Sequence, residues 1–385
     1  MFAKIWYHPR FRSLFFQSLF IVLLFFCIKT IWGILQQNLA VRDVGTGFGF
    51  LSESAGFNII QHLIFYDEQS SYFRVFLVGL LNTLLVSGIG IMLATIVGVL
   101  IGVARVSSHR LLRTLAIVYV QTLRNIPLLL QLFIWYFVVL RAAPLPLHHL
   151  DLFNAIYITN RGIYIPQPIT TFDSLGLLVI FFAFLCAGFF SLYLNRKTCF
   201  QLGKNVTFYY FMSIGFYFAA AVFIGLFIRS LQWEMPTLGR FNFEGGINLL
   251  PEFLALLLAL TFFTAAYISE VVRMGLLSVP KGQWEAATAL GFSKWQTLRL
   301  IIIPQSLKVI LPPLTNQYLN LIKNSSLATA IAYPDLVSIF AGTALNQTGQ
   351  AIEIIAMTMA VYLFISVLIS LMMLTYERAT LWGKK

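Results

Sequence analysis

Long apolar runs recur along this chain and constrain its fold more than any other feature. A helix of about 20 apolar residues crosses a hydrocarbon layer about 30 Å thick. We count eight such runs, at residues 14–35, 73–103, 114–140, 175–194, 208–229, 249–269, 304–330 and 353–375. Because lipid offers no partner for backbone N–H and C=O groups, each run must satisfy them within a helix. The sequence therefore predicts an all-α polytopic membrane protein with about eight transmembrane helices.

The charge balance agrees with a membrane protein. Only 10% of the 385 residues are charged, against about 25% in soluble domains. The net charge of +12 could suggest a nucleic-acid partner, but basic loops on the cytosolic side of a membrane explain it better. We therefore expect a lipid bilayer around the chain and no nucleic acid.

The distribution of basic residues predicts the orientation of the chain. With a cytosolic N-terminus, sixteen Lys and Arg residues fall on the cytosolic side and about six on the other. Most acidic residues of the loops lie on the opposite side. This asymmetry follows the positive-inside rule and predicts that both termini are cytosolic. The first run is too long for a typical signal-peptide core, so we interpret it as a retained span.

Metal and cofactor chemistry finds little support in the sequence. The three cysteines, Cys27, Cys186 and Cys199, form no C-x-x-C pair, so they predict neither a disulfide framework nor a zinc site. His148 and His149 lie in a proline-broken loop with only Asp151 nearby. We expect no metal and no cofactor in this chain.

A short segment between the sixth and seventh apolar runs predicts a contact site for another protein. Glu285-Ala286-Ala287 is followed by Gly291, which is enough chain for two helical turns with a small, alanine-bearing surface. Gly291 suits a C-terminal cap with positive φ. The alternative is a plain loop helix lying at the level of the lipid headgroups.

Several motifs in a fixed order carry a family resemblance. Glu285-Ala286-Ala287 with Gly291 and Ile301-Ile302-Ile303-Pro304 resembles the E-A-A-x-x-x-G signature and downstream I-x-L-P of ABC importer permeases, with Ile303 in place of Leu. Five further segments resemble the polar-amino-acid branch of that family: Gly79–Leu84, Arg124–Gln131, Ser278–Trp284, Leu311–Gln317 and Leu321–Leu327. The long layout looks most like the Q-type permease of the general L-amino-acid transporter.

The resemblance implies an architecture and an energy source. It implies a type I importer core, MetI-like, in two parts, 73–140 and 249–385, with a cytosolic coupling loop at about 270–303. Residues 1–72 would form an added anchor span and outer segment, and 141–248 an insertion with two extra spans. Lipid, a partner or the outer protein could each cover that insertion. No G-x-x-x-x-G-K-[ST] loop occurs in the sequence, so this chain is not expected to hydrolyse ATP.

The resemblance also implies partners. They are an ABC ATPase carrying ATP and Mg, a second and shorter permease subunit, and a periplasmic amino-acid-binding protein, in a bacterial cell inner membrane. The ATPase would dock on Glu285, Ala286, Ala287 and Gly291. An ion-coupled secondary transporter is disfavoured because the acidic residues of the apolar runs, such as Glu270, lie near run ends rather than at the middle. A membrane enzyme or an exporter has still less support.

Two polar stripes cross apolar runs at helical spacing, and both suit a path for L-amino acids. Charged groups inside a membrane helix cost about 2.5–3.5 kcal/mol, so they should face a partner helix or a wet path. Interhelical hydrogen bonding or snorkelling explains the stripes equally well. The stripes consist of Gln121, Arg124, Asn125 and Gln131, and of Asn316, Gln317, Asn320 and Lys323. A further pair, Gly98 and Gly102, predicts close helix packing.

Overall fold

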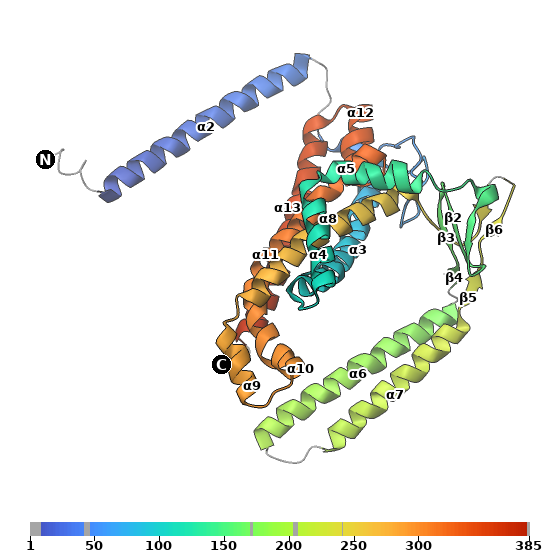
Figure 1. Cartoon of the computed structure of the whole chain (residues 1–385). Coiled ribbons are helices and arrows are strands. Elements are labelled where there is room, and N and C mark those ends of the chain that lie inside the picture. Colours follow the sequence, from blue (N-terminus) through green and yellow to red (C-terminus); the bar gives the residue numbers. More distant parts are fainter. Residues whose placement is uncertain (1–8, 42–46, 170–171, 203–206, 241, 383–385) are drawn as a thin grey trace. The chain divides into compact units, whose positions relative to one another are not determined.

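A computed structural model describes residues 9–41, 47–169, 172–202, 207–240 and 242–382 (Figure 1). Helices dominate it, as the sequence predicts. The long helices are α2 (Pro9–Val41), α3 (Tyr72–Val106), α6 (Phe172–Leu202), α7 (Thr207–Ser230), α8 (Pro251–Leu277), α11 (Ile303–Asn324) and α13 (Ala351–Trp382). Shorter helices are α4 (Arg110–Asn125), α5 (Leu128–Phe133), α9 (Lys281–Ala289), α10 (Lys294–Thr297) and α12 (Leu345–Thr348). Three described segments are 3-10 helix: η1 (Gly49–Ser52), η3 (Pro146–His148) and η5 (Ser325–Ile331). Three others are π-helix: η2 (Ile134–Leu140), η4 (Leu298–Ile302) and η6 (Leu336–Ala344).

Every predicted apolar run lies mainly on helix. Among the described residues, five helical segments are long and apolar enough to span a membrane, and a sixth is obtained if α4 and the α5–η2 helix count as one broken span. The break falls at Ile126-Pro127, where proline disfavours helix in the residue before it. Two shorter apolar stretches, Phe15–Ile31 and Val179–Leu192, occupy two other predicted runs. The polytopic helical fold is thus confirmed, and the number eight stays a prediction.

The chain divides into two compact units, residues 1–130 with 256–385, and residues 131–255. In the first unit, a buried cluster joins the segment before α3 to the segment before α13. Phe50 and Tyr72 pack there with Phe340 of η6. The Asn82 side-chain amide of α3 donates to the backbone carbonyls of Gln61 and Pro334, each at 2.8 Å. The segment between α11 and α13 therefore contributes to this core through η6.

The glycine pair of α3 packs closely on α8. A Cβ atom built on Gly98 would lie 2.7 Å from the Ile268 side chain, and one on Gly102 would lie 2.7 Å from Val272. Such distances leave no room for a larger residue, so the two backbones approach because both positions are glycine. The packing role predicted from the spacing is confirmed.

The second unit contains short strands that the sequence analysis did not anticipate. The strands are β1 (Leu150–Leu152), β2 (Ile156–Thr159), β3 (Gly162–Ile165), β4 (Gln167–Ile169), β5 (Gln232–Glu234), β6 (Thr237–Leu238), β7 (Phe243–Glu244) and β8 (Ile247–Leu249). One antiparallel sheet has the order β1-β2-β3-β8, while β4 pairs with β5 and β6 with β7. Tyr157 and Tyr164 flank Phe243 at ring-centroid distances of 4.6 and 5.1 Å. The helices α6 and α7 pack on each other within the same unit, partly by stacking of Phe184 on Phe223.

Candidate functional site

The segment singled out as a contact site is a short capped helix. Helix α9 covers Lys281–Ala289 and ends in two cap bonds: Gly291 N–H donates to the Thr288 carbonyl at 3.0 Å, and Phe292 N–H to the Ala287 carbonyl at 3.1 Å. This paired pattern needs a left-handed residue at the turn, and Gly291 has φ +77°. The predicted helix and glycine cap are both present.

The helix presents most of its surface outward. Ala287 is 1% exposed and anchors the helix, whereas Glu285 and Ala286 are exposed. Beyond the cap, Leu290 is 75% exposed and Trp295 is 65% exposed. Exposed apolar side chains on such a turn suit contact with another protein or with the lipid headgroup region. We call the segment 281–297, which comprises α9, its turn and α10, the docking turn.

The second half of the docking turn is held by a capping box. The Ser293 side chain accepts from Gln296 N–H at 3.3 Å, and the Gln296 side chain accepts from Ser293 N–H at 2.9 Å. Reciprocal bonds of this kind satisfy two backbone donors at a helix start. The docking turn therefore keeps its shape through contacts among its own residues.

The first polar stripe lies mainly on α4. Gln121, Arg124 and Asn125 are exposed, and their spacing of three and four residues puts them on one face. The stripe's fourth member, Gln131, lies on α5 within the second unit and is 3% exposed. The structure thus groups three of the four residues on one helix and buries the fourth.

The second polar stripe lies on α11. Asn316, Asn320 and Lys323 are exposed and Gln317 is partly buried. Within the part of the chain that the structure describes, none of these four side chains forms a hydrogen bond or an ion pair. Helix α11 packs against α13 and α3, and runs unbroken through Pro312 and Pro313. These side chains are therefore free to meet a solute or another subunit.

An ionic cluster that the sequence analysis missed surrounds Glu270 of α8. Arg105 of α3 donates to Glu270 Oε2, and Arg273 Nη2 donates to Oε1 at 2.6 Å. Arg124 of α4 is the third arginine of the cluster, with its Nη1 3.8 Å from Glu270 Oε2. Its guanidinium also lies 5.0 Å from the centre of the Tyr267 ring. The cluster collects residues from three helices. Sequence spacing alone relates only Glu270 and Arg273, which are three residues apart on α8.

The charges of this cluster do not balance. Three guanidinium groups face one carboxylate, which leaves two positive charges in excess. The two oxygens of Glu270 are engaged by Arg105 and Arg273, and the Glu270 side chain is only 18% exposed. Such an excess of positive charge attracts anions.

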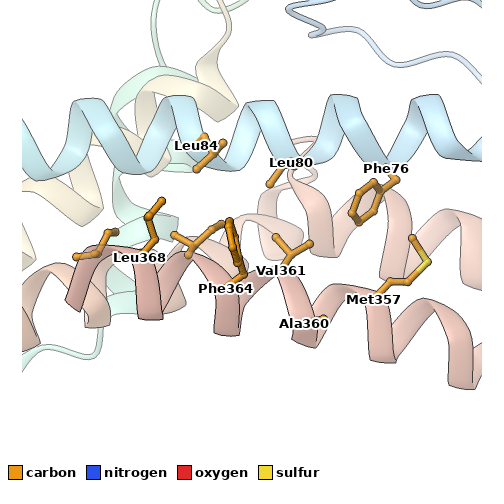
Figure 2. Close-up of a pocket in the computed structure, with 10 residues that line it drawn as sticks. Phe76, Leu80, Leu84, Met357, Ala360, Val361, Phe364 and Leu368 are labelled. Carbon is orange, nitrogen blue, oxygen red and sulfur yellow. The ribbon is translucent and has the colours of Figure 1, made fainter. Parts of the chain in front are cut away.

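A groove elsewhere in the first unit has the opposite chemistry. This groove of about 520 Å³ lies between α3 and α13 and is lined only by apolar side chains, including Phe76, Leu84 and Phe364 (Figure 2). It offers no hydrogen-bonding side chain to a charged solute. Burying an unpaired charge there would be strongly unfavourable, so this groove is not a candidate path for a polar substrate.

No metal centre is found where the structure describes the chain: His, Cys, Asp and Glu side chains form no group of three or more that could hold an ion. The candidate site is therefore made of two elements, the docking turn and the polar face of α4 with its ionic cluster.

Comparison with known proteins places these elements in one family. Residues 86–380 match the model of the binding-protein-dependent transport system inner membrane component. YhdX of Escherichia coli (strain K12), provisionally named an amino-acid ABC transporter permease protein, is 47% identical over 96% of this chain and 94% of its own length. AapQ of Rhizobium johnstonii, a general L-amino acid transport system permease protein, is 44% identical over 97% of this chain and 93% of its own. BztB of Rhodobacter capsulatus, a glutamate/glutamine/aspartate/asparagine transport system permease protein, is 37% identical over 97% and 94%.

Proposed function

This chain belongs to the family of binding-protein-dependent transport system inner membrane components, and from that premise we propose that it forms the membrane path of an ATP-driven importer of L-amino acids. Members of this family are non-enzymatic membrane subunits, and ATP is hydrolysed by a partner. The observation that carries the proposal is the docking turn, because it joins an exposed apolar surface to an ordered helix in the region that the family model covers.

The substrate class rests on the relatives. Three proteins that match nearly the whole chain are named for amino-acid transport, and two of those names specify L-amino acids in general or four polar amino acids. The α4 face suits such a solute, because an amino acid carries both a carboxylate and an ammonium group. Guanidinium and amide groups supply the donors and acceptors that the two charges need.

Energy coupling is assigned to the docking turn. We propose that an ABC ATPase carrying ATP and Mg binds Glu285, Ala286, Ala287 and Gly291, and that its closure on ATP moves α9. The small side chains of α9 permit close approach of another backbone. The exposed Leu290 and Trp295 supply the apolar area that a stable contact needs.

The remaining partners and the topology complete the proposal. A second, shorter permease subunit would face the polar stripes, and a periplasmic binding protein would deliver the amino acid. The excess of basic residues near the docking turn supports a cytosolic position for it and for both termini. Residues 1–72 and 141–248 would lie outside the two-part core, as an anchor with an outer segment and as an insertion.

Purification of the intact complex from native membranes tests this function. We expect the tagged chain to bring down an ATPase and a second permease, and we expect L-amino acids with the binding protein to stimulate ATP hydrolysis. If the chain is purified without an ATPase, and takes up amino acids in ATP-depleted vesicles under an imposed ion gradient, it is a secondary transporter instead.

A further inference from the structure

We propose that Arg124 is a substrate-binding residue that takes the carboxylate of the transported amino acid, with Gln121 and Asn125 of the same helix face taking the ammonium group. This inference rests on the proposed function and names a binding point within it. The bound group is the α-amino acid backbone and not its side chain, so the site would accept many amino acids.

Arg124 has unused hydrogen-bond donors. A guanidinium group carries five N–H donors. Arg124 forms no hydrogen bond to the described residues, since its nearest acidic oxygen, Glu270 Oε2, is 3.8 Å away. Its side chain is 40% exposed. Arg124 is therefore held near a negative charge while its donors stay open to a ligand.

Three arginines compete for the carboxylate of Glu270. Arg105 and Arg273 already hydrogen bond to the two oxygens of that carboxylate. Arg124 is the most exposed of the three arginines and lies farthest from Glu270. A ligand carboxylate could thus pair with Arg124, in the bidentate geometry that guanidinium favours, without breaking either of the short bonds.

The Arg124 side chain is oriented before any ligand arrives. Its guanidinium lies over the Tyr267 ring at 5.0 Å, and Glu270, three residues further along α8, lies 3.8 Å from its Nη1. A cation over an aromatic face is stabilised by the ring's quadrupole. An arginine restrained in this way loses less conformational entropy on binding than a free one.

The ammonium group of the transported amino acid needs acceptors of its own. Because Glu270 is saturated by arginines, it is not available to a second cation, and the ammonium must find other acceptors. Gln121 and Asn125 flank Arg124 on α4 at positions three residues before and one after it, and both are exposed. Their amide oxygens can accept from an ammonium beside the carboxylate.

The test uses the whole complex in vesicles and compares Arg124→Gln, Arg124→Lys and a control, Arg113→Gln. Arg113 is an exposed arginine of the same helix without an ion pair to the described residues. Uptake of a labelled L-amino acid and stimulated ATP hydrolysis are measured together. We expect Arg124→Gln to lower the amino acid moved per ATP at least tenfold while hydrolysis stays stimulated. Arg124→Lys should recover part of the loss, and Arg113→Gln should match the parent.

Two arms separate the possible sources of the anionic group. Binding of a labelled L-amino acid to the complex without the binding protein should be competed by other L-amino acids and not by the amines that lack the carboxylate. The vesicle experiment is repeated with neutral lipid only. A defect of Arg124→Gln that appears only with anionic lipid would assign Arg124 to a headgroup and overturn the proposal.

Normal uptake per ATP in Arg124→Gln would also overturn the proposal that Arg124 binds the carboxylate. So would amines that compete for binding as well as L-amino acids do. If no amino acid stimulates hydrolysis in the parent complex, the proposed function fails and this inference fails with it. If hydrolysis is stimulated and uptake is normal in every variant, only the inference fails.

Discussion

The docking turn and the cluster around Glu270 are ordered in opposite ways. The docking turn is fixed by hydrogen bonds between residues that lie three to five positions apart, such as Phe292 N–H to the Ala287 carbonyl. The cluster is fixed by side chains that are far apart in the chain, with Arg105 and Glu270 separated by 165 positions. A locally ordered segment can be moved by a partner without unfolding the core, whereas the cluster exists only when α3, α4 and α8 are packed.

This comparison gives a general expectation. Substitutions in the docking turn should impair coupling and leave the stability of the core unchanged. Substitutions at the α3–α8 contact or in the cluster should lower core stability. The four predictions below test that separation.

The largest effect is expected from Gly291→Trp and Glu285→Lys. A tryptophan at φ +77° is strained by about 1–3 kcal/mol, and a reversed charge opposes docking. We expect both variants to insert in the membrane and to lose ATP-dependent uptake at least tenfold. Gly291→Asn is the control, because asparagine adopts this conformation readily. Co-purification with an ATPase that is still stimulated normally would contradict the docking role.

A large loss of stability is expected from Gly102→Ala. The added Cβ would lie 2.7 Å from the Val272 side chain and would push α3 away from α8. Overpacking of this kind costs about 1–3 kcal/mol, which should appear as a lower melting temperature in detergent. The matched control is Gly88→Ala on the same helix, where a Cβ meets nothing within 4 Å. Equal melting temperatures for the two variants would refute the close contact.

Glu270→Gln should lower stability by a similar amount. The change leaves three arginines without their common anion, and removal of one partner from a buried ion pair costs about 3–5 kcal/mol. The loss here should be nearer 2 kcal/mol, because Arg124 and Arg273 are partly solvated. Thermal unfolding at low and high salt measures it, and a loss that is unchanged by Arg124→Gln in the same chain would show that the two residues do not interact.

The smallest effect is expected from Ser293→Ala. Loss of a capping serine costs about 1 kcal/mol, and here it should loosen only the four residues of α10. Hydrogen exchange of backbone amides 294–297 should become faster, while the melting temperature of the core stays the same. A lower melting temperature would mean that the docking turn is part of the core's cooperative unit.

The contrast between local and distant order also explains what the sequence could reveal. The docking turn and the Gly98–Gly102 contact depend on patterns within a few residues, so helix propensity, cap chemistry and small-residue spacing predict them. The Glu270 cluster depends on which helices pack together, and no spacing relates Arg105 or Arg124 to Glu270. The sequence alone therefore places Glu270 at a run end and leaves Arg124 with two interpretations, a solute path and snorkelling.

The strands of the second unit were missed for a related reason. Each has two to four residues, which is too short for an alternating pattern to stand out from a loop. Two of the pairings among the described strands also join distant segments, β4 with β5 and β3 with β8, where Ile163 lies opposite Leu249. Pairing across such a separation is visible only in the folded chain.

The hydrogen bonds at the end of α9 have a mechanical consequence. From Leu290 to Ser293, every backbone N–H is engaged: Leu290 donates to Ala286, Gly291 to Thr288, Phe292 to Ala287, and Ser293 to the Gln296 side chain. No backbone N–H in this part of the docking turn is left without an acceptor, so the turn resists bending. Under the proposed function, a displacement of α9 by the ATPase would be transmitted through α10 and η4 to α11, which are in contact in that order.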